Sequence, residues 1–359
     1  MADVEEQTVP YREYLAARRT VLGGLLIGLV GLILVAISVG PTTIPIRKTA
    51  RILLDGPGGS STTATILWEI RVPRALGALV IGAGLSVSGA VMQSVLNNPL
   101  GSPYTLGISH AAMFGASLTI VALGGQAVTA GSGTVLSVVS PYTVSIVAFL
   151  MGLVSTGVIV ALATYRSATP ETMILTGIAL GSLFTAGTTA LQYVATQEEL
   201  ASLVYWSFGD VGRTTWRSVG IMAAVLGPSL VYFLRRSWAY NALDAGDEAA
   251  RGVGVDVEAV RNRGMILSSL VTALTVSFVG IIGFVGLVVP HIVRKTTGNN
   301  KEFLLPISTV LGGILLLASD TAARTAFSPT VIPVGIVTSF IGAPFFIYLV
   351  IRGREYWTE

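Results

Sequence analysis

The residues that could do chemistry are few and lie far apart. The 359 residues include no cysteine and only two histidines, His110 and His291. Thiolate metal sites are therefore excluded, and two distant histidines are too few for a histidine-rich metal centre or a catalytic cluster. We interpret each histidine as a hydrogen-bonded structural residue.

The three lysines do not belong to a nucleotide-binding loop. They follow Arg47, Arg294 and Asn300, so no G-x-x-x-x-G-K-[ST] sequence is present to hold the phosphates of ATP. We expect no catalytic site, no metal and no cofactor in this chain. If it is part of a pump, ATP and magnesium belong to a separate polypeptide.

Two short groups of charged residues remain. Arg71 and Arg74 flank a proline one helical turn apart. The segment LDAGDEAARGVG, which begins at Leu243, places acidic residues before Ala250 and Arg251 and glycines on both sides. Acidic residues suit the start of a helix and glycines permit tight turns, so this segment predicts a short helix between two turns.

These residues must be positioned by helices in lipid. Hydrophobic residues make up 52% of the chain, charged residues only 11%, and the mean hydropathy is +0.75, whereas a soluble domain carries about 25% charge. Hydropathy predicts helices near 20–40, 72–93, 104–123, 141–163, 171–194, 217–235, 261–281, 283–293, 303–319 and 331–351. The eighth is too short to span alone, which predicts a broken or half-buried segment. We expect an all-α integral membrane protein with about ten transmembrane helices.

One polytopic domain accounts for the length. We assign residues 1–19 to a polar N-terminal segment, 20–352 to the transmembrane domain and 353–359 to a tail, and read the first apolar run as an uncleaved helix. Ten spans put both termini on one side. With that side inside, 14 of the 22 Lys and Arg residues are cytoplasmic, which predicts cytoplasmic termini in the plasma membrane. The net charge of +3 does not indicate a nucleic-acid partner.

Small residues recur at a spacing of four within the spans. One face of the second predicted helix carries Ala78, Gly82, Ser86 and Ala90. On the fifth predicted helix, Gly177 and Gly181 share one face in the same way. Such faces let helix backbones approach closely in lipid. The alternative is that they line a passage.

The spans contain almost no ionisable residue in their interiors. Proton- and sodium-coupled carriers place such residues near the bilayer midplane. An ion-coupled secondary transporter of a small solute is therefore the less favoured alternative, and an externally driven transporter is favoured.

Four blocks resemble a known family. They are RVPRALGALVIGAGLSVSGAVMQSVLNNPLGSPYTLGIS from Arg71, LDAGDEAARGVGVDVEAVRNRG from Leu243, GIIGFVGLVVPHIVR from Gly280 and PVGIVTSFIGAPFFIYL from Pro333. In this order and spacing, over about residues 15–352, the chain resembles the FecCD family of ABC importer permeases. The resemblance implies the type II importer permease fold, a homodimer, two ABC ATPase subunits that hold ATP and magnesium, and one extracytoplasmic binding protein. Its cargo would be a metal chelate: cobalamin or a ferric siderophore, with haem or an oxyanion such as molybdate as further options.

The resemblance also implies roles for residues. Arg71, Arg74 and Arg324 would form a basic rim at the outer mouth that contacts glutamates of the binding protein; the alternative for the first two is snorkelling to lipid phosphates. The loop 240–258 would be the cytoplasmic coupling loop that contacts the ATPase; the alternative is a solvated loop. Its proposed coupling residues are Gly246, Glu248, Ala250, Arg251 and Gly254.

The turn Asn98–Pro99–Leu100 would help to close a cytoplasmic gate, and the alternative is a plain connection. Two departures from the family pattern stand out. Thr169–Pro170–Glu171 does not reproduce the Thr–Ser of the family's second gate loop. Val331 stands where the family has a glutamate before its Pro–Val–Gly motif.

Overall fold

The computed structural model describes residues 11–40, 42–59, 61–122, 141–166, 169–326 and 330–352. Each of the ten predicted apolar segments coincides with a helix. These helices are α1 Tyr11–Ser38, α4 Val72–Val95, α5 Ile108–Ala122, α6 Pro141–Arg166, α7 Pro170–Val194, α9 Trp216–Arg235, α12 Val257–Val279, α13 Val285–Thr297, α14 Lys301–Thr325 and α15 Val334–Arg352. The predicted all-α fold is confirmed. Most of the N-terminal segment, residues 167–168 of the second gate loop and the tail 353–359 lie outside the described residues.

Lengths separate the spans into two groups. Seven helical stretches of the described chain are long and apolar enough to cross a membrane, and α5 and α15 are apolar but shorter. Helix α13 has only 13 residues and is separated from α12 by an irregular stretch at 280–284, as the short eighth segment predicted. The chain is therefore a multi-pass membrane protein with one broken helix pair.

Seven further helical pieces were not predicted by hydropathy. They are α2 Ile46–Asp55, α3 Thr62–Thr65, the π-helical turn Ile66–Arg71, α8 Gln197–Ser207, the 3₁₀ turn Val211–Arg213, α10 Ser237–Asp244 and α11 Asp247–Gly252. Polar side chains define some of these ends: Thr196 and Glu199 form a reciprocal capping box at the start of α8. These pieces are too short or too polar to give a span-like signal.

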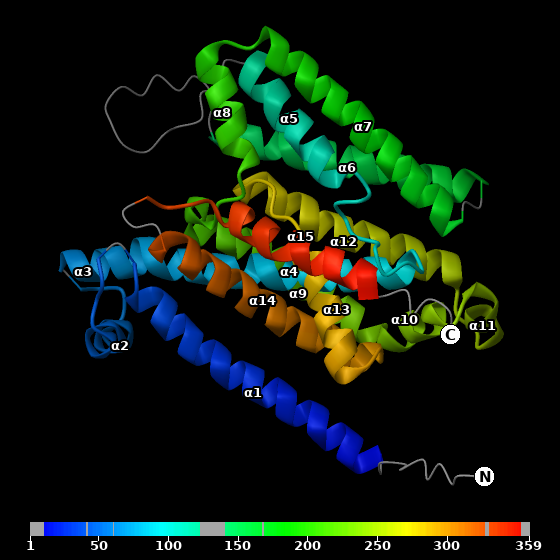
Figure 1. Cartoon of the computed structure of the whole chain (residues 1–359), viewed down its shortest axis with the longest axis horizontal. Helices are drawn as coiled ribbons and strands as arrows, with labels where there is room; N and C mark the ends of the chain where they lie inside the picture. The colour runs from blue at the N-terminus through cyan, green and yellow to red at the C-terminus, as the bar shows by residue number, and fades with distance from the viewer. Residues whose placement is uncertain are drawn as a thin grey trace.

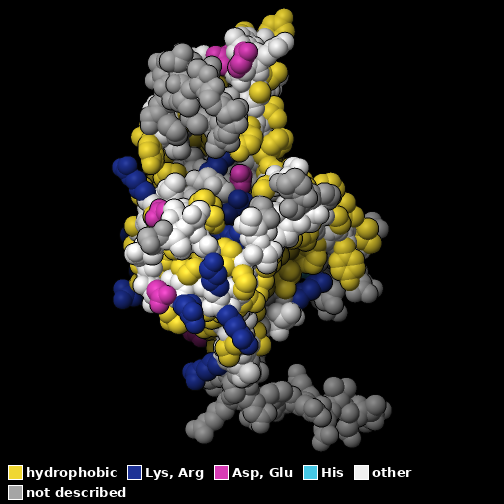
Figure 2. Space-filling model, turned by 90° about the vertical axis from the view of Figure 1, so that its left-hand side faces the viewer, with side chains coloured by type: hydrophobic (Ala, Val, Ile, Leu, Met, Phe, Trp, Pro, Cys, Tyr) yellow, Lys and Arg dark blue, Asp and Glu magenta, His cyan; other side chains and the backbone are white. Residues whose placement is uncertain are grey.

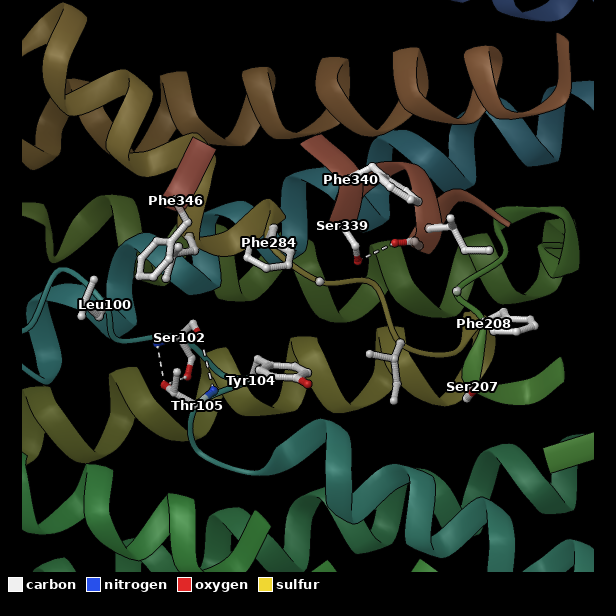
Figure 3. Close-up of a pocket in the computed structure, with 16 residues that line it drawn as sticks. Leu100, Ser102, Tyr104, Thr105, Ser207, Phe208, Phe284, Ser339, Phe340 and Phe346 are labelled. Atoms are coloured by element: carbon white, nitrogen blue, oxygen red, sulfur yellow. Dashed lines mark hydrogen bonds between the residues drawn. The ribbon is translucent and has the colours of Figure 1, made fainter. Parts of the chain in front are cut away.

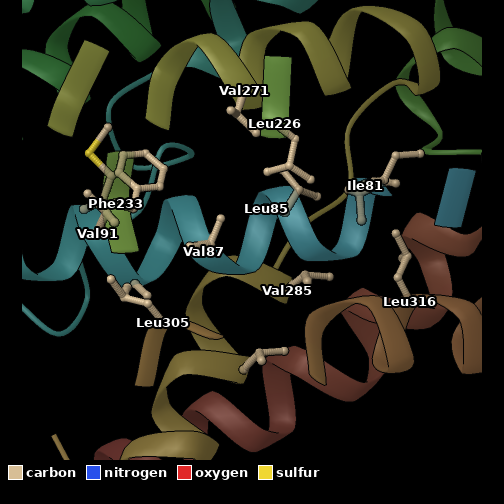
Figure 4. Packing of buried hydrophobic residues seen from close by; sticks show 14 of the residues in the cluster. Ile81, Leu85, Val87, Val91, Leu226, Phe233, Val271, Val285, Leu305 and Leu316 are labelled. Atoms are coloured by element: carbon tan, nitrogen blue, oxygen red, sulfur yellow. The ribbon is translucent and has the colours of Figure 1, made fainter. Parts of the chain in front are cut away.

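Helix α4 is the centre of the bundle. It packs against α14 and α13 on one side and against α12 and α9 on the other (Figure 1). Ile81, Leu85, Val87 and Val91 of α4 point into a layer of apolar side chains from these four helices (Figure 4). Because α4 contacts neighbours all round, the surrounding helices determine where its two ends lie.

Close backbone contacts hold α4 in place. A Cβ added at Gly82 would lie 2.2 Å from the carbonyl oxygen of Gly312, and one at Gly89 would lie 1.8 Å from that of Gly286. Ala78, Gly82, Ser86 and Ala90 are all buried, so the predicted small-residue face of this helix is a packing face. Gly177 of α7 likewise packs against the backbone of residue 106.

We predict that Gly89→Ala destabilises the fold, because the added methyl group meets backbone atoms of α13 that can move only with their helix. Overpacking of this kind costs about 1–3 kcal/mol. Thermal unfolding in detergent should show a lower midpoint for this variant. Gly220→Ala on α9, where a Cβ would meet nothing within 4 Å, is the control. Equal midpoints for the two variants would contradict the close contact.

Candidate functional site

A cavity of about 670 Å³ lies between α15, the start of α13 and the turn that follows α4 (Figure 3). Phe284, Phe340 and Phe346 line one side, and Ser102 and Tyr104 line the other. Its 16 lining residues include hydroxyl groups but no charged side chain. The cavity can therefore hold a bulky solute through apolar contact and a few hydrogen bonds, and it has no charged group for catalysis.

The break between α12 and α13 forms one wall of this cavity. Phe284 has a left-handed backbone (φ 67°), and its side chain packs against Gly342 of α15. Backbone groups freed by the break find partners in neighbouring segments: the N–H of Asp210 donates to the carbonyl of Val279 (2.9 Å). Irregular backbone at membrane depth requires such partners or a water-filled cavity.

A second cavity of about 900 Å³ lies between residues 98–107 and α7. Gly177, Gly181 and His110 line it, so the glycine face of α7 both packs and borders a hollow. The His110 ring lies 5.1 Å from the ring of Tyr104, between centroids. Leu100 and Tyr104 belong to the walls of both cavities. The predicted gate turn thus stands between the two hollows.

The Asn98–Pro99–Leu100 turn has a defined shape. Asn97 has φ 42°, and the Asn98 side chain accepts a hydrogen bond from the Leu100 N–H (2.8 Å). The Gly101 N–H donates to the Asn98 carbonyl oxygen (2.9 Å). The non-helical turn expected from Pro99 is present, and 41% of Leu100 is exposed.

The opposite end of α4 carries the predicted docking arginines. Arg71 donates to the carbonyl oxygens of Ile37 (2.9 Å) and Ser38 (2.8 Å), and Arg324 donates to that of Ala36. These carbonyls end α1 and have no partner within their own helix. Arg71 and Arg324 are only 6% and 5% exposed. Both side chains cap the end of α1, so neither is presented to solvent in this structure.

Arg74 lies in a buried group of charges. Its guanidinium donates to both carboxylate oxygens of Asp320 (2.8 and 3.1 Å) and lies 3.6 Å from Asp210. Arg324 lies 3.5 Å from the same Asp320 carboxylate. The Asp320 side chain is 1% exposed and that of Arg74 is 15% exposed. Arg74 is therefore the predicted docking residue closest to solvent.

Figure 2 looks at this end of the bundle, and dark-blue Lys and Arg side chains stand out on it. Arg47, Lys48 and Arg51 on α2 are exposed, and so is Arg217 at the start of α9. Exposed positive charge is thus present here, mainly on a helix that hydropathy did not predict.

The predicted coupling loop forms α10 and α11. Gly246 (φ 100°) precedes α11 and Gly254 (φ 84°) follows it, so both glycines adopt the left-handed backbone that the turn pattern predicted. Glu248 and Arg251 are exposed, whereas Ala250 is 0% exposed and faces the chain's own core. Ala250 can therefore support α11 but cannot present its side chain to a partner.

Sequence reasoning missed three residues of these sites. Asp320 and Asp210 surround Arg74, and Val253, 66% exposed, projects from the turn after α11. The spacing of Asp320 and Arg324, four residues apart on one helix, is a signal that could have found the first. An apolar residue between two glycines in a polar loop is the signal for Val253.

Sequence comparison finds relatives along nearly the whole chain. A model of the FecCD transport family matches residues 27–352. A Methanocaldococcus jannaschii protein named as an ABC transporter permease is 46% identical over 96% of this chain and 98% of its own length. A hemin transport permease of Yersinia pestis is 33% identical (94% and 97% covered), and a cobalamin import permease of Halobacterium salinarum is 39% identical (83% and 76% covered).

A solved structure has the same fold. It is described as an inward-facing conformation of a metal-chelate type ABC transporter, with 30% identity, a TM-score of 0.80, and coverage of 93% of this chain and 99% of that chain. These similarities do not favour an ion-coupled carrier. The chain belongs to the FecCD transport family, and it is the membrane-spanning permease subunit of an ABC importer.

Proposed function

We propose that two copies of this permease form the passage of an importer for metal chelates: cobalamin or a ferric siderophore, with haem as a further option. Two ABC ATPase subunits bind at the α11 end and hold ATP and magnesium, and one binding protein docks at the Arg74 end. The permease contributes no catalytic site and no cofactor. The α11 end faces the cytoplasm of a plasma membrane, with both termini on that side.

The main support for this function is the uncharged cavity beside the gate turn. A cavity of about 670 Å³ lined by phenylalanines and hydroxyl groups suits a large solute with apolar faces. An ion-coupled carrier would instead place charged groups at such a site. Arg251, Arg261, Arg263 and Arg294 lie at the α11 end, which fits a cytoplasmic side rich in positive charge.

Exposed apolar residues support a second copy. Phe340 on α15 is 77% exposed while it lines the first cavity, and Ile178 on α7, which lines the second cavity, is 54% exposed. A passage for a polar cargo needs protein on every side, because lipid cannot solvate polar groups. A second subunit related by two-fold symmetry would supply the missing wall.

Uptake experiments test the function. The permease, reconstituted in liposomes with its ATPase and binding protein, should accumulate at least one of three probes in an ATP-dependent manner: cyanocobalamin, a ferric siderophore or haemin. The permease purified alone should hydrolyse no ATP, because it has no nucleotide loop. Hydrolysis by the isolated chain, or uptake driven by an ion gradient without ATP, would contradict the proposal.

The turn after α11 supports the ATPase contact. Val253 is 66% exposed and stands beside exposed Glu248 and Arg251 at the tip of the bundle. In the proposed contact this side chain enters a groove of the ATPase, where its apolar surface is removed from water.

We predict that Val253→Asp weakens binding of the ATPase subunits and lowers ATP hydrolysis by the mixture. Burying an unpaired carboxylate at the contact costs a few kcal/mol. The thermal midpoint of the permease alone should not change, because the side chain is exposed. Val253→Leu keeps the apolar contact and is the matched control. Normal complex formation by the Asp variant in size-exclusion chromatography would show that the segment is a solvated loop.

Docking of the binding protein is proposed to use Arg71, Arg74 and Arg324 unequally. Arg71 and Arg324 could bind a partner's carboxylate only by releasing the carbonyl groups of α1. Arg74 is partly exposed, and Asp320 holds its guanidinium in one orientation. A fixed, partly exposed arginine can meet a carboxylate of the partner at little conformational cost.

We predict that Arg74→Gln slows association of the binding protein with the assembled transporter. One partly exposed ion pair contributes about 0.2–1 kcal/mol, and added salt should shrink the difference from the unsubstituted protein. Stopped-flow or surface-plasmon measurements at low and high salt would give the rates. An unchanged rate at low salt, with poorer membrane insertion, would instead favour a lipid-facing role.

A further inference from the structure

We infer that Arg261 and Arg294 are positioning residues that transmit movement of α10 and α11 to the turn Asn98–Leu100. The inference rests on the proposed function, because it assumes that ATPase subunits move α11. Each arginine joins this coupling segment to the last residues of α4 through hydrogen bonds. We call these two connections the Arg261 route and the Arg294 route.

The Arg261 route is direct. Arg261 lies on α12, is 6% exposed, and donates through Nη2 to Asp247, the first residue of α11 (2.7 Å). Its Nε donates to the carbonyl oxygen of Val95, the last residue of α4 (3.0 Å). One guanidinium therefore touches both the coupling helix and the residue that lies two positions before Asn97.

The Arg294 route passes through one asparagine. Arg294 on α13 donates through Nη2 to the Gln93 side chain (2.8 Å) and through Nε to that of Asn299 (3.0 Å). Asn299 donates in turn to Asp244, the last residue of α10 (2.8 Å). Gln93 is 3% exposed, and its backbone carbonyl accepts the N–H of Asn98 (2.9 Å). The gate turn is thus bonded to the residue that Arg294 holds.

A third cation fixes the far end of the Arg294 route. Lys301 is 1% exposed, lies 2.7 Å from the Asp244 carboxylate and donates to Asn299 (2.8 Å). A buried cation deprived of its partner is strongly unfavourable, so these bonds are costly to break one at a time. The α10–α11 segment and the end of α4 must therefore move together or exchange partners together.

Apolar packing alone would not impose this coupling. Apolar contacts have no direction and allow sliding, whereas charge-assisted hydrogen bonds fix direction and distance. Both routes end within four residues of Asn97, from two different helices, α12 and α13. Holding the turn from two sides makes its position depend on where α11 stands.

The absence of cysteine from the chain makes a labelling test possible. Leu100→Cys, at a position 41% exposed in this structure, introduces a single thiol at the turn. In the transporter assembled with its ATPase subunits, the rate of reaction with a charged maleimide is measured without nucleotide and with ATP plus orthovanadate. We expect nucleotide to change this rate. No change would overturn the coupling inference, whereas uptake and ATP hydrolysis test the proposed function separately.

The test variants combine Leu100→Cys with Arg261→Gln, with Arg294→Gln, or with both. We expect the double substitution to abolish the nucleotide-dependent change in labelling rate while the complex still hydrolyses ATP. Arg261→Lys keeps the charge but cannot hold both partners with fixed geometry, so it should restore only part of the response. Arg263→Gln, exposed on the same helix, should leave the response unchanged.

A purely structural role predicts another pattern: lower thermal midpoints, with an unchanged labelling response in the complexes that assemble. That result would overturn the inference without affecting the proposed function. If the arginine variants fail to assemble, Gln93→Met removes the acceptor of the Arg294 route and introduces no charge. A normal labelling response in this variant would overturn the Arg294 route.

Discussion

The structure depends on close backbone contact around α4. Lipid gives no hydrophobic drive for helices to associate, so packing distance and polar contacts must hold the bundle. Gly82 against Gly312 and Gly89 against Gly286 bring α4 into backbone contact with α14 and α13. Because α4 packs at backbone distance on these neighbours, it sets where the arginines at its start and the turn at its end lie relative to α13 and α14. This one helix therefore positions both the arginine cluster at its start and the gate turn at its end.

The same lipid explains where charge is found. Asp320 sits at 1% side-chain exposure only because Arg74 and Arg324 neutralise it, and Lys301 is buried against Asp244 at the other end. Unpaired charges that are buried in this way would be very costly. The buried ion pairs lie near helix ends, where they also fix neighbouring segments to α4. The charged pairs therefore join elements at the two ends of the bundle, and the first cavity between them contains no charged side chain.

Much of this fold can be predicted from the sequence. A smaller part of the candidate site can be predicted. Apolar runs of about 20 residues predict spans because only helices satisfy the backbone in lipid, and all ten runs are helices. The burial of Arg71 was not predictable, because its acceptors lie at the end of α1, more than 30 residues away. The partner of Arg74 is more distant still, at Asp320. Short polar helices such as α2 and α11 give no hydropathy signal.

The uncharged cavity is suited to letting a solute pass and poorly suited to selecting which solute is carried. A wall of phenylalanines with a few hydroxyl groups makes weak contacts that many large solutes could share, and weak contacts let a solute leave as readily as it enters. Strong discrimination requires buried polar groups that the wrong solute leaves unpaired. The lining offers a few hydroxyl groups for this purpose and no charged group, so in the proposed importer we assign most of the choice of chelate to the binding protein. Relatives that are 33% and 39% identical to this chain are named for hemin and for cobalamin, so the named cargo differs within one sequence family.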